Sequence, residues 1–374
     1  MRGIRSSALV LIVLSVAAVQ PISAGAKACQ SWGAPPPYVG ASDVTLQDVA
    51  AAGPCSAWAV SSFDDGGTMH TLILGWNGTK WSVVPSPNRG TGANFLRGVT
   101  AISPTDAWAV GSYLGPVDYL TLVLHWNGTA WKVVKSPNAI TDSFNDLFDV
   151  DATSANNVWA VGERDGKPGY RALILHWNGV AWRLQKAPDV AGPDDELFGV
   201  AAASSTDAWA VGCSETRSLI LRRHANRWRR VPSPSPGTGP CLEGATALPT
   251  GQAWAAGHFL GTSGDTSLVV RWNGRAWKRQ NVPSPGDSSA LKDVAAASKT
   301  NAWAVGWSVG TFGTSTVVLH WDGTAWKRQP SADPDQSFPL DNLLYGVTAI
   351  PHGGAWAVGD YAGTYRTPLI AHCC

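Results

Sequence analysis

Tryptophan recurs along this chain at three fixed positions of one repeating unit. Nineteen of the 20 tryptophans obey this rule, and Trp307 does not. The first position lies in an apolar phrase, most often Ala-Trp-Ala-Val-Gly, and is held by Trp58, Trp108, Trp159, Trp209, Trp254, Trp303 and Trp356. The second and third positions flank a turn and are held by Trp76, Trp126, Trp177, Trp272 and Trp321, and by Trp32, Trp81, Trp131, Trp182, Trp228, Trp277 and Trp326. The chain therefore repeats one supersecondary unit of about fifty residues.

Residues 96–137 show what one unit contains. Short apolar segments at 96–102, 107–112, 122–126 and 130–135 predict four strands, called a, b, c and d below. Asn127-Gly128, between strands c and d, predicts a two-residue type I′ hairpin turn. Pro137 ends strand d, where the loss of a ladder donor does least harm. Since no helical period occurs after the N-terminal segment, the chain is predicted to be all-β.

The phrase of strand b occurs seven times, which predicts a seven-bladed β-propeller of four-stranded antiparallel blades. One blade cannot bury both faces of its sheet, so the blades must stack and the ring must close. The last unit offers only three strands, at 344–350, 355–360 and 369–372. Trp32 precedes Val49 by 17 residues, as Trp277 precedes Val294. We therefore expect residues 32–38 to complete the last blade, within a single domain of residues 29–374.

Six cysteines indicate disulfides in an exported chain, because that compartment is usually oxidising. In the last blade Cys373 takes the Trp position of the c–d turn, and Cys29 takes the Thr position three places later. Residues so related across a turn are within disulfide reach. We expect a Cys29–Cys373 bond to replace the covalent turn, with Cys374 as the alternative partner. Cys213 and Cys241 are expected to form a second pair, on the face that carries the b–c and d–a loops.

The N-terminus has the features of a secretory signal peptide. Arg2 and Arg5 precede an uncharged apolar run at residues 8–19, and small residues follow as far as Ala28. The run is short for a bilayer span, and no later segment offers one. We expect residues 1–28 to be cleaved and the mature chain to be secreted or extracellular, with lipid attachment at Cys29 as the alternative.

The mature chain is expected to carry almost no net charge. Without residues 1–28 it has 25 basic and 27 acidic residues, a formal charge of −2. This balance gives no electrostatic footprint for nucleic acid. The one basic cluster, residues 222–230, is predicted to be a solvated pair of outer strands, since charges commonly guard sheet edges. We expect a monomer without a membrane span.

The phrases Asp-Ala-Trp-Ala-Val-Gly at 106–111 and His-Trp-Asn-Gly-Thr-Ala-Trp at 125–131 resemble the repeats of secreted bacterial tandem-repeat β-propellers. The resemblance covers essentially all of the mature chain. The unit is kelch-like in length but lacks the paired glycines of kelch strands, the Trp-Asp ending of the WD40 unit and the Asp-box of sialidases. The resemblance implies the fold and implies no catalytic residue.

No nucleophile motif, phosphate loop or metal-ligand spacing stands out, so the sequence predicts no catalytic residue, no metal and no cofactor. Histidine recurs at one position of strand c, which indicates a framework role for His125, His176, His320 and His372. Acids recur two residues after the Leu of strand a, near the predicted channel, at Asp48, Asp149 and Asp293. Such a ring could bind a cation or water, but hydrogen bonding to neighbouring backbone is the simpler interpretation.

The b–c and d–a loops are long and differ between blades, and variable loops on a rigid ring are where binding usually occurs. The residues just after the Val-Gly of strand b diverge too. They are the predicted ligand contacts: Phe63, Tyr113, Glu163, Arg164, His258, Phe259, Trp307, Asp360 and Tyr361. Aromatic rings beside charged groups suit sugar rings or peptide side chains. The alternative interpretation is that the aromatic residues cap the core at the strand ends.

The sequence thus predicts an exported, non-enzymatic binding or scaffold protein that presents its variable loop face to carbohydrate or to a protein partner. The alternative is an extracellular hydrolase or lyase that acts on polysaccharide, because fold alone does not decide between these functions. A glycosidase needs two carboxylates across its site. Glu163 and Asp360 are the only acids among the predicted contacts.

Overall fold

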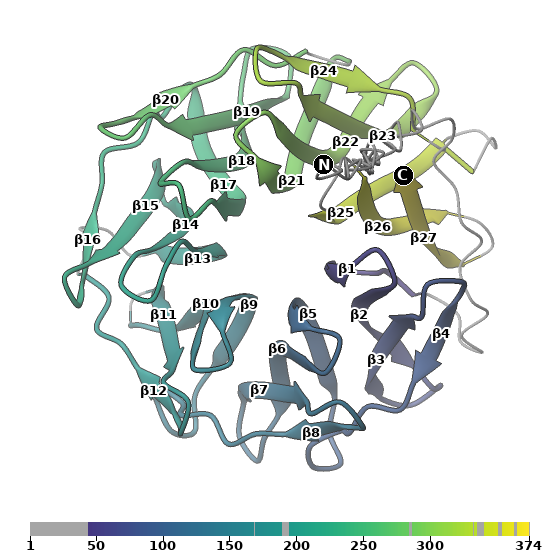
Figure 1. Cartoon of the computed structure of the whole chain (residues 1–374), viewed down its shortest axis with the longest axis vertical. Coiled ribbons are helices and arrows are strands. Elements are labelled where there is room, and N and C mark those ends of the chain that lie inside the picture. The colour runs from purple at the N-terminus through teal and green to yellow at the C-terminus, as the bar shows by residue number, and fades with distance from the viewer. Residues whose placement is uncertain are drawn as a thin grey trace, which may run out of the picture.

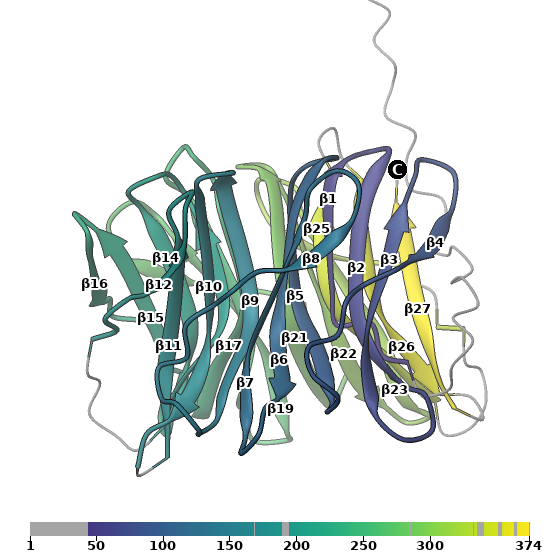
Figure 2. The same cartoon turned by 90° about the horizontal axis from the view of Figure 1, so that it is seen from below.

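The computed structural model describes residues 44–374, except 168, 189–193, 284–285, 332, 335–339, 351–353, 363–364 and 374. Of Leu340 and Cys373 it describes the backbone only. Seven antiparallel blades stand around a central channel, with the first strand of each blade innermost (Figure 1). Seen from the side, the strands run between two faces that carry the loops (Figure 2). The predicted seven-bladed, all-β propeller is confirmed.

Consecutive strands pair within each blade. Blade 1 consists of β1 (Asp48–Gly53), β2 (Ser56–Asp64), β3 (Met69–Trp76) and β4 (Trp81–Val84). Blade 2 consists of β5 (Asn94–Ser103), β6 (Asp106–Leu114), β7 (Tyr119–Trp126) and β8 (Trp131–Val133). Blade 3 consists of β9 (Asn145–Ser154), β10 (Asn157–Asp165), β11 (Tyr170–Trp177) and β12 (Trp182–Leu184). Blade 4 consists of β13 (Asp195–Ala202), β14 (Ala208–Ser214), β15 (Arg217–His224) and β16 (Arg227–Arg230).

Blade 5 consists of β17 (Thr238–Ala247), β18 (Ala253–Leu260), β19 (Asp265–Trp272) and β20 (Trp277–Arg279). Blade 6 consists of β21 (Ser288–Ser298), β22 (Asn301–Gly310), β23 (Gly313–Trp321) and β24 (Trp326–Gln329). Blade 7 consists, among the described residues, of β25 (Leu340–Ala349), β26 (Ala355–Ala362) and β27 (Arg366–Cys373). A short parallel pairing of β23 with β25 joins blades 6 and 7.

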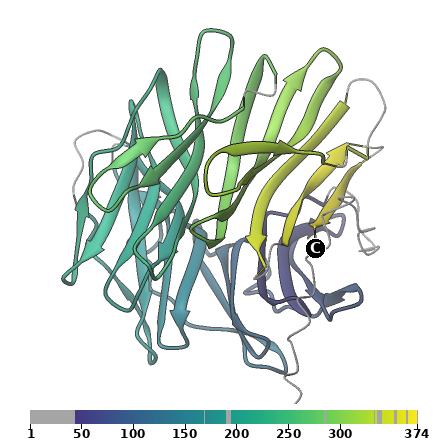
Figure 3. The same cartoon turned by 45° about the horizontal axis from the view of Figure 1, so that its top comes forward.

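The ring closes between blades 7 and 1. Trp356 of blade 7 lies 5.0 Å from Trp76 and 5.2 Å from Trp81 of blade 1, measured between ring centroids. The C-terminal strand β27 lies beside blade 1 (Figure 3). Residues 32–38 and Cys29 lie outside the described residues, so the closing strand and the Cys29–Cys373 bond remain predictions.

The tryptophans bury one blade against the next. Trp108 of blade 2, for example, packs against Trp177 and Trp182 of blade 3, with ring centroids 5.0 and 5.4 Å away. The strand-c histidines stack on the strand-b tryptophans of their own blades, as His176 does on Trp159 at 3.9 Å. Nε2 of His176 also forms a 2.8 Å hydrogen bond with Asn157. The framework role predicted for these histidines is confirmed.

Two residues of the basic cluster prove to be framework instead of solvated edge charges. In blade 4, Arg222 and Arg223 occupy the strand-c positions that carry His and Trp in other blades. Arg222 forms two hydrogen bonds with Asp207 and lies 4.8 Å above the ring of Trp209. Arg223 lies 4.7 Å above the ring of Trp159. Through cation–π interactions, Arg222 thus replaces the stacked histidine of its own blade, and Arg223 replaces an aromatic contact between blades 3 and 4.

The prediction of a two-residue type I′ turn at Asn127-Gly128 is wrong. Trp126 pairs directly with Trp131, which leaves a four-residue loop between them. In this loop only Gly128 has a positive φ, of 90°. The Asn127 side chain instead accepts hydrogen bonds from the backbone N–H groups of Thr129 and Ala130. An Asx turn of this kind satisfies the loop backbone without a second left-handed residue.

Candidate functional site

Strand a of the blades carries a β-bulge where it meets the Gly that follows Val in strand b. In blade 2 the pairing shifts between Leu96 and Gly98, so that Arg97 is the extra residue. The same shift occurs in blades 3 to 7. A Cβ atom added at Gly111 of strand b would lie only 2.1 Å from the carbonyl oxygen of Phe95, so the bulge requires the recurrent glycine. Bulges re-aim side chains and are common beside functional sites.

The bulged residues line a cavity of about 290 Å³ at the mouth of the channel. Gln47 takes the equivalent place in blade 1, just before β1. We call these seven half-buried side chains, one from each blade, the bulge ring: Gln47, Arg97, Phe148, Phe198, Glu243, Lys292 and Tyr345. All lie at the start of strand a, on the face that carries the b–c and d–a loops, called the loop face below.

Aromatic and cationic members of the bulge ring stack across three blades. The rings of Phe148 and Phe198 are stacked at 26°, with centroids 5.2 Å apart. The Arg97 guanidinium lies 5.3 Å from the Phe148 ring and forms a 2.9 Å hydrogen bond with Asp146. Stacking of this kind gives the mouth a fixed apolar wall on the side of blades 2 to 4.

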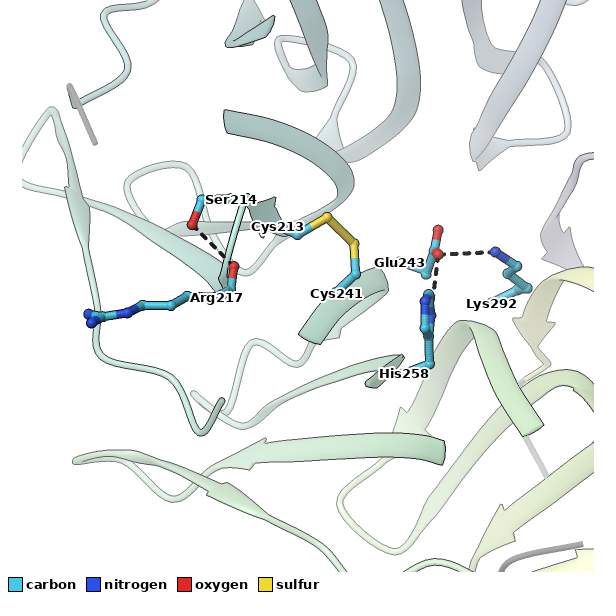
Figure 4. The surroundings of a disulfide bond; sticks show 7 residues. All are labelled: Cys213, Ser214, Arg217, Cys241, Glu243, His258 and Lys292. Atoms are coloured by element: carbon cyan, nitrogen blue, oxygen red, sulfur yellow. Dashed lines mark hydrogen bonds and ion pairs between the residues drawn. A yellow bond between two sulfur atoms is a disulfide. The ribbon is translucent and has the colours of Figure 1, made fainter. Parts of the chain in front are cut away.

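The opposite part of the bulge ring carries an ion pair. Lys292 of blade 6 donates a 3.0 Å hydrogen bond to Glu243 of blade 5. Nδ1 of His258 lies 3.6 Å from the same carboxylate, too far for a good hydrogen bond. This charged group lies beside the disulfide between Cys213 and Cys241 (Figure 4).

Below the bulge ring, three carboxylates form the floor of the cavity: Asp48, Asp149 and Asp293, the channel acids. Each accepts one backbone N–H of its own blade and one of the next blade. Asp149, for instance, accepts 2.7 Å hydrogen bonds from Val150 and from Val200 of blade 4. The channel acids therefore form hydrogen bonds with backbone across blade interfaces. This is the simpler of the two interpretations of these acids in the sequence.

Burial raises the pKa of every channel acid, because the channel removes the carboxyl groups from water. The pKa of Asp149 rises to about 8, through desolvation and the nearby charge of Asp293. Desolvation raises the pKa of Asp293 to about 7. The pKa of Asp48 lies well above its ordinary value, through desolvation and then the charges of Asp149 and Asp293. Asp149 and Asp293 therefore change protonation near neutral pH.

Each channel acid requires glycine at the equivalent position of the preceding blade. A Cβ added at Gly98 would lie 2.8 Å from the Cα of Asp149, and one added at Gly244 would lie 2.7 Å from the Cα of Asp293. Because the ring has an odd number of blades, strict alternation fails once, at Gly199 and Gly244 of blades 4 and 5. No channel acid links these two blades, but the disulfide Cys213–Cys241 does. That predicted pair is confirmed.

Four of the predicted ligand contacts lie closer to the loop face than the bulge ring does. Glu163, His258, Trp307 and Asp360 directly follow the strand-b glycine. Burial, together with Glu196 and Asp146, raises the pKa of Glu163 to about 8, and Glu163 shares a hydrogen bond with Glu196. Trp307 is half-buried.

Asp360 lies apart from Glu163. It accepts a 2.8 Å hydrogen bond from Thr45 and lies 3.2 Å from the Arg366 guanidinium. Desolvation raises its pKa. The two acids considered for a hydrolase therefore belong to separate hydrogen-bonded clusters, on blades 3 and 7.

The predicted contacts one residue further along strand b pack into the blade interfaces. Tyr113 and Phe259 are buried in the cores between blades 1 and 2 and between blades 4 and 5. Phe63 and Tyr361 pack against the cores on either side of blade 7. Arg164 takes the same position in blade 3 and donates a 3.1 Å hydrogen bond to the carbonyl of Asp165. We do not carry these five residues into the proposed site.

Sequence reasoning missed the bulge ring, although a signal for it is present. In each unit the frame Leu-X-(Asp or Gly)-(Val or Ala) recurs at the start of strand a, as in residues 96–99 and 291–294. The residue X differs in nearly every blade while its neighbours hardly change. A residue that varies between otherwise constant neighbours occupies a position whose side chain the fold does not require. Among the described residues, no group of three or more His, Cys, Asp or Glu side chains has the arrangement of a metal site.

No protein-family model and no curated protein matches the chain. Several solved structures do. YCF48 bound to a D1 peptide is similar over 93% of this chain and 98% of that chain, with a TM-score of 0.56 and 15% identity. YCF48 from Cyanidioschyzon merolae is similar over 91% and 98%, with a TM-score of 0.55 and 14% identity. A protein of unknown function from Dyadobacter fermentans is similar over 88% and 94%, with a TM-score of 0.53 and 9% identity. At such identities the likeness shows the propeller fold alone.

Proposed function

We propose that the protein is an exported, non-enzymatic binding propeller whose loop face takes a segment of a protein partner at the channel mouth. The observation that carries this proposal is the bulge ring. Seven different positions converge on one cavity, and they are the variable positions of an otherwise constant scaffold. A rigid frame that presents variable side chains to a concave surface is typical of a binding site.

Exposed apolar side chains around the mouth favour a protein over a sugar as the ligand. The described residues include 11 exposed large apolar side chains. Seven of these lie in or beside the b–c hairpins of the loop face: Leu114, Val117, Tyr170, Leu260, Val309, Phe312 and Tyr365. The other four are scattered, three on outermost strands and Val180 in a turn of the opposite face. Apolar side chains gathered on one face are typical of protein interaction surfaces.

Two further observations support parts of the proposal. The structurally similar YCF48 binds a D1 peptide, which makes a peptide ligand compatible with this architecture. Export is supported by the signal-like residues 1–28 and by the disulfide between Cys213 and Cys241, because disulfides persist mainly in oxidising compartments. Within the part of the chain that the structure describes, no helix has the length and apolar character needed to cross a bilayer.

The test uses the mature protein as bait for exported proteins of its own source, with covalent cross-linking and mass spectrometry. A partner should be retained by the parent and by Val180→Ala, which changes an 81% exposed side chain on the opposite face. It should be lost from Phe148→Ala/Phe198→Ala. Glycan-array binding without such a partner would replace the protein ligand by carbohydrate. Release of sugar from extracellular polysaccharide, abolished by Glu163→Gln, would establish the hydrolase instead.

A further inference from the structure

A row of aromatic rings runs along the loop face of blades 2 and 3. The ring centroids of Tyr170 and Phe144 are 5.6 Å apart, those of Phe144 and Tyr119 are 6.4 Å apart, and those of Tyr119 and Phe95 are 5.8 Å apart. Tyr170 is exposed and the other three are half-buried. We call these four residues the aromatic track. The track begins at Tyr170, the first residue of β11 in blade 3, and ends at Phe95, near the start of β5, the innermost strand of blade 2 (Figure 1).

Arg97 joins the aromatic track to the mouth cavity. Its guanidinium lies 5.9 Å from the ring of Phe95 and 5.3 Å from the ring of Phe148. Phe148 in turn stacks on Phe198. Arg97 is held in place by its hydrogen bond to Asp146, whose side chain is only 2% exposed. A continuous surface of aromatic rings and one guanidinium plane therefore extends from a hairpin of blade 3 to the wall of the cavity.

The cavity at the end of this surface has, at its floor, carboxyl groups without cationic partners among the described residues. The two cations of the bulge ring are already paired, Arg97 with Asp146 and Lys292 with Glu243. In contrast, the channel acids accept hydrogen bonds from backbone N–H groups, and none of the three forms an ion pair with a described residue. A cationic group that enters the cavity would meet carboxyl groups with which no described side chain forms an ion pair.

We propose that this surface binds an extended peptide that lays apolar side chains along the aromatic track and inserts a lysine side chain into the mouth cavity. The inference rests on the proposed binding function and names the chemistry of its ligand. The flexible stem of lysine would pack on Phe148 and Phe198, and its ammonium group would lie above the channel acids. Lysine combines an apolar stem with a compact charge in this way, and aromatic faces attract such cations.

Geometry favours a peptide over a sugar chain on the aromatic track. Neighbouring rings of the track are inclined to one another by 57° to 78°, and three of the four are half-buried. They form a ridged apolar strip instead of flat platforms. In an extended peptide, side chains on one side recur every ~6.6 Å. That spacing is close to the 5.6–6.4 Å between the rings, so alternate side chains of a peptide would meet successive gaps.

The protonation of the channel acids predicts how pH affects the ligand. The charged and titratable groups that face the ammonium position are the three channel acids, Asp151 one step deeper, and Arg97, Glu243, Lys292 and Tyr345 at the rim. Burial raises the pKa of Asp149 to about 8, with the charges of Asp293 and Asp151 as further causes, and burial raises the pKa of Asp293 to about 7. These groups gain negative charge between about pH 6 and about pH 9, while a lysine ammonium stays protonated. Affinity for the lysine peptide should therefore increase over this range.

The experiment uses the mature protein and fluorescein-labelled pools of short peptides, with fluorescence anisotropy as the readout. One pool has a fixed lysine, with phenylalanine fixed two and four positions away and random residues elsewhere. Two matched pools replace the lysine by glutamate or the phenylalanines by serine. The first pool should bind about tenfold more tightly than either, a difference of about 1.4 kcal/mol. Its advantage over the glutamate pool should be larger at about pH 9 than at about pH 6.

Variants locate the effect on the surface. Phe148→Ala/Phe198→Ala should weaken binding of the first pool about tenfold, and Val180→Ala should leave it unchanged. Equal binding of all pools by the parent protein would overturn the ligand chemistry, whatever the folding of any variant. If a cross-linked protein partner still depends on the loop face in that case, the binding function stands and only the peptide chemistry falls. If neither pools nor partner bind at this face, both proposals fall.

Discussion

Removal of the disulfide between blades 4 and 5 should lower the stability of this protein by several kcal/mol, about the usual effect of losing a native disulfide. Cys213 and Cys241 lie on adjacent blades, with their Cα atoms 4.7 Å apart and a sequence separation of 28. They span the one interface at which glycine takes the channel-acid position in both blades, so no channel acid bonds one blade to the other there. The disulfide joins the two blades where no channel acid does.

The magnitude follows from the length of the loop that the disulfide closes. A closed loop of 28 residues restricts the unfolded chain by about 3.5 kcal/mol at room temperature in the chain-entropy description. For a chain of this size, unfolding entropy is roughly 0.7 kcal/mol per degree, so the melting temperature should fall by about 5 °C. We expect this loss for Cys213→Ala/Cys241→Ala under oxidising conditions.

The assay is equilibrium unfolding in urea, with the free energy extrapolated to water and the slope compared between proteins. Cys55→Ala is the matched control, because Cys55 is exposed and forms no disulfide with a described residue. Reduction of the parent should reproduce the instability of the double variant. A double variant as stable as the Cys55→Ala control would refute the view that the disulfide stabilises this interface.

The other predictions concern the floor, the mouth and the closure of the ring. Asp149→Ala removes the acceptor of two buried backbone amides and should cost about 2–4 kcal/mol in urea unfolding, whereas exposed Asp287→Ala should cost less than about 0.5 kcal/mol. Because burial raises the pKa of Asp149 from its ordinary value of 3.8 to about 8 in the folded state, its stabilising effect is full below the unfolded pKa and is lost as pH rises through about 8; unfolding midpoints that do not fall between about pH 4 and about pH 8 would contradict this. Trp307→Ala should leave the melting temperature nearly unchanged and weaken partner binding several-fold, and global unfolding of this variant would make Trp307 a core residue. Peptide mapping of the mature protein should find Cys29 joined to Cys373, and a free thiol at Cys29 would remove the proposed closure.

The fold was predictable from the sequence because each blade repeats the same physical solution. Strand-b tryptophans such as Trp108 need cover from the next blade, and their spacing counts the blades directly. The pairing of Cys213 with Cys241 followed from the face on which the repeat places them. The prediction of a two-residue turn at Asn127-Gly128 is wrong because the Asn127 side chain accepts hydrogen bonds from the loop backbone. The loop therefore needs no second residue in the left-handed conformation.

The candidate site was only partly predictable. The sequence indicated the loop face and the channel acids, but it did not single out the bulge ring, and the ligand contacts that it predicts lie on strand b beside that ring. Tyr113 and Phe259 diverge between blades because each blade interface needs its own cap, so their variation reflects packing. Variation at Arg97 or Phe148 has a different cause, because a bulge turns these side chains into the mouth.

Sequence alone determined the number of blades, the order of the strands and the tryptophan contacts between blades, because these depend on local periodicity and on burial that every repeat needs equally. Tertiary structure alone decided that seven bulged residues meet in one cavity, that an aromatic track leads from blade 3 to its wall, and that the channel acids lie at its floor without cationic partners among the described residues. The physical reason is ring closure. Residues about fifty positions apart in the chain become neighbours around the channel only when the last blade packs against the first.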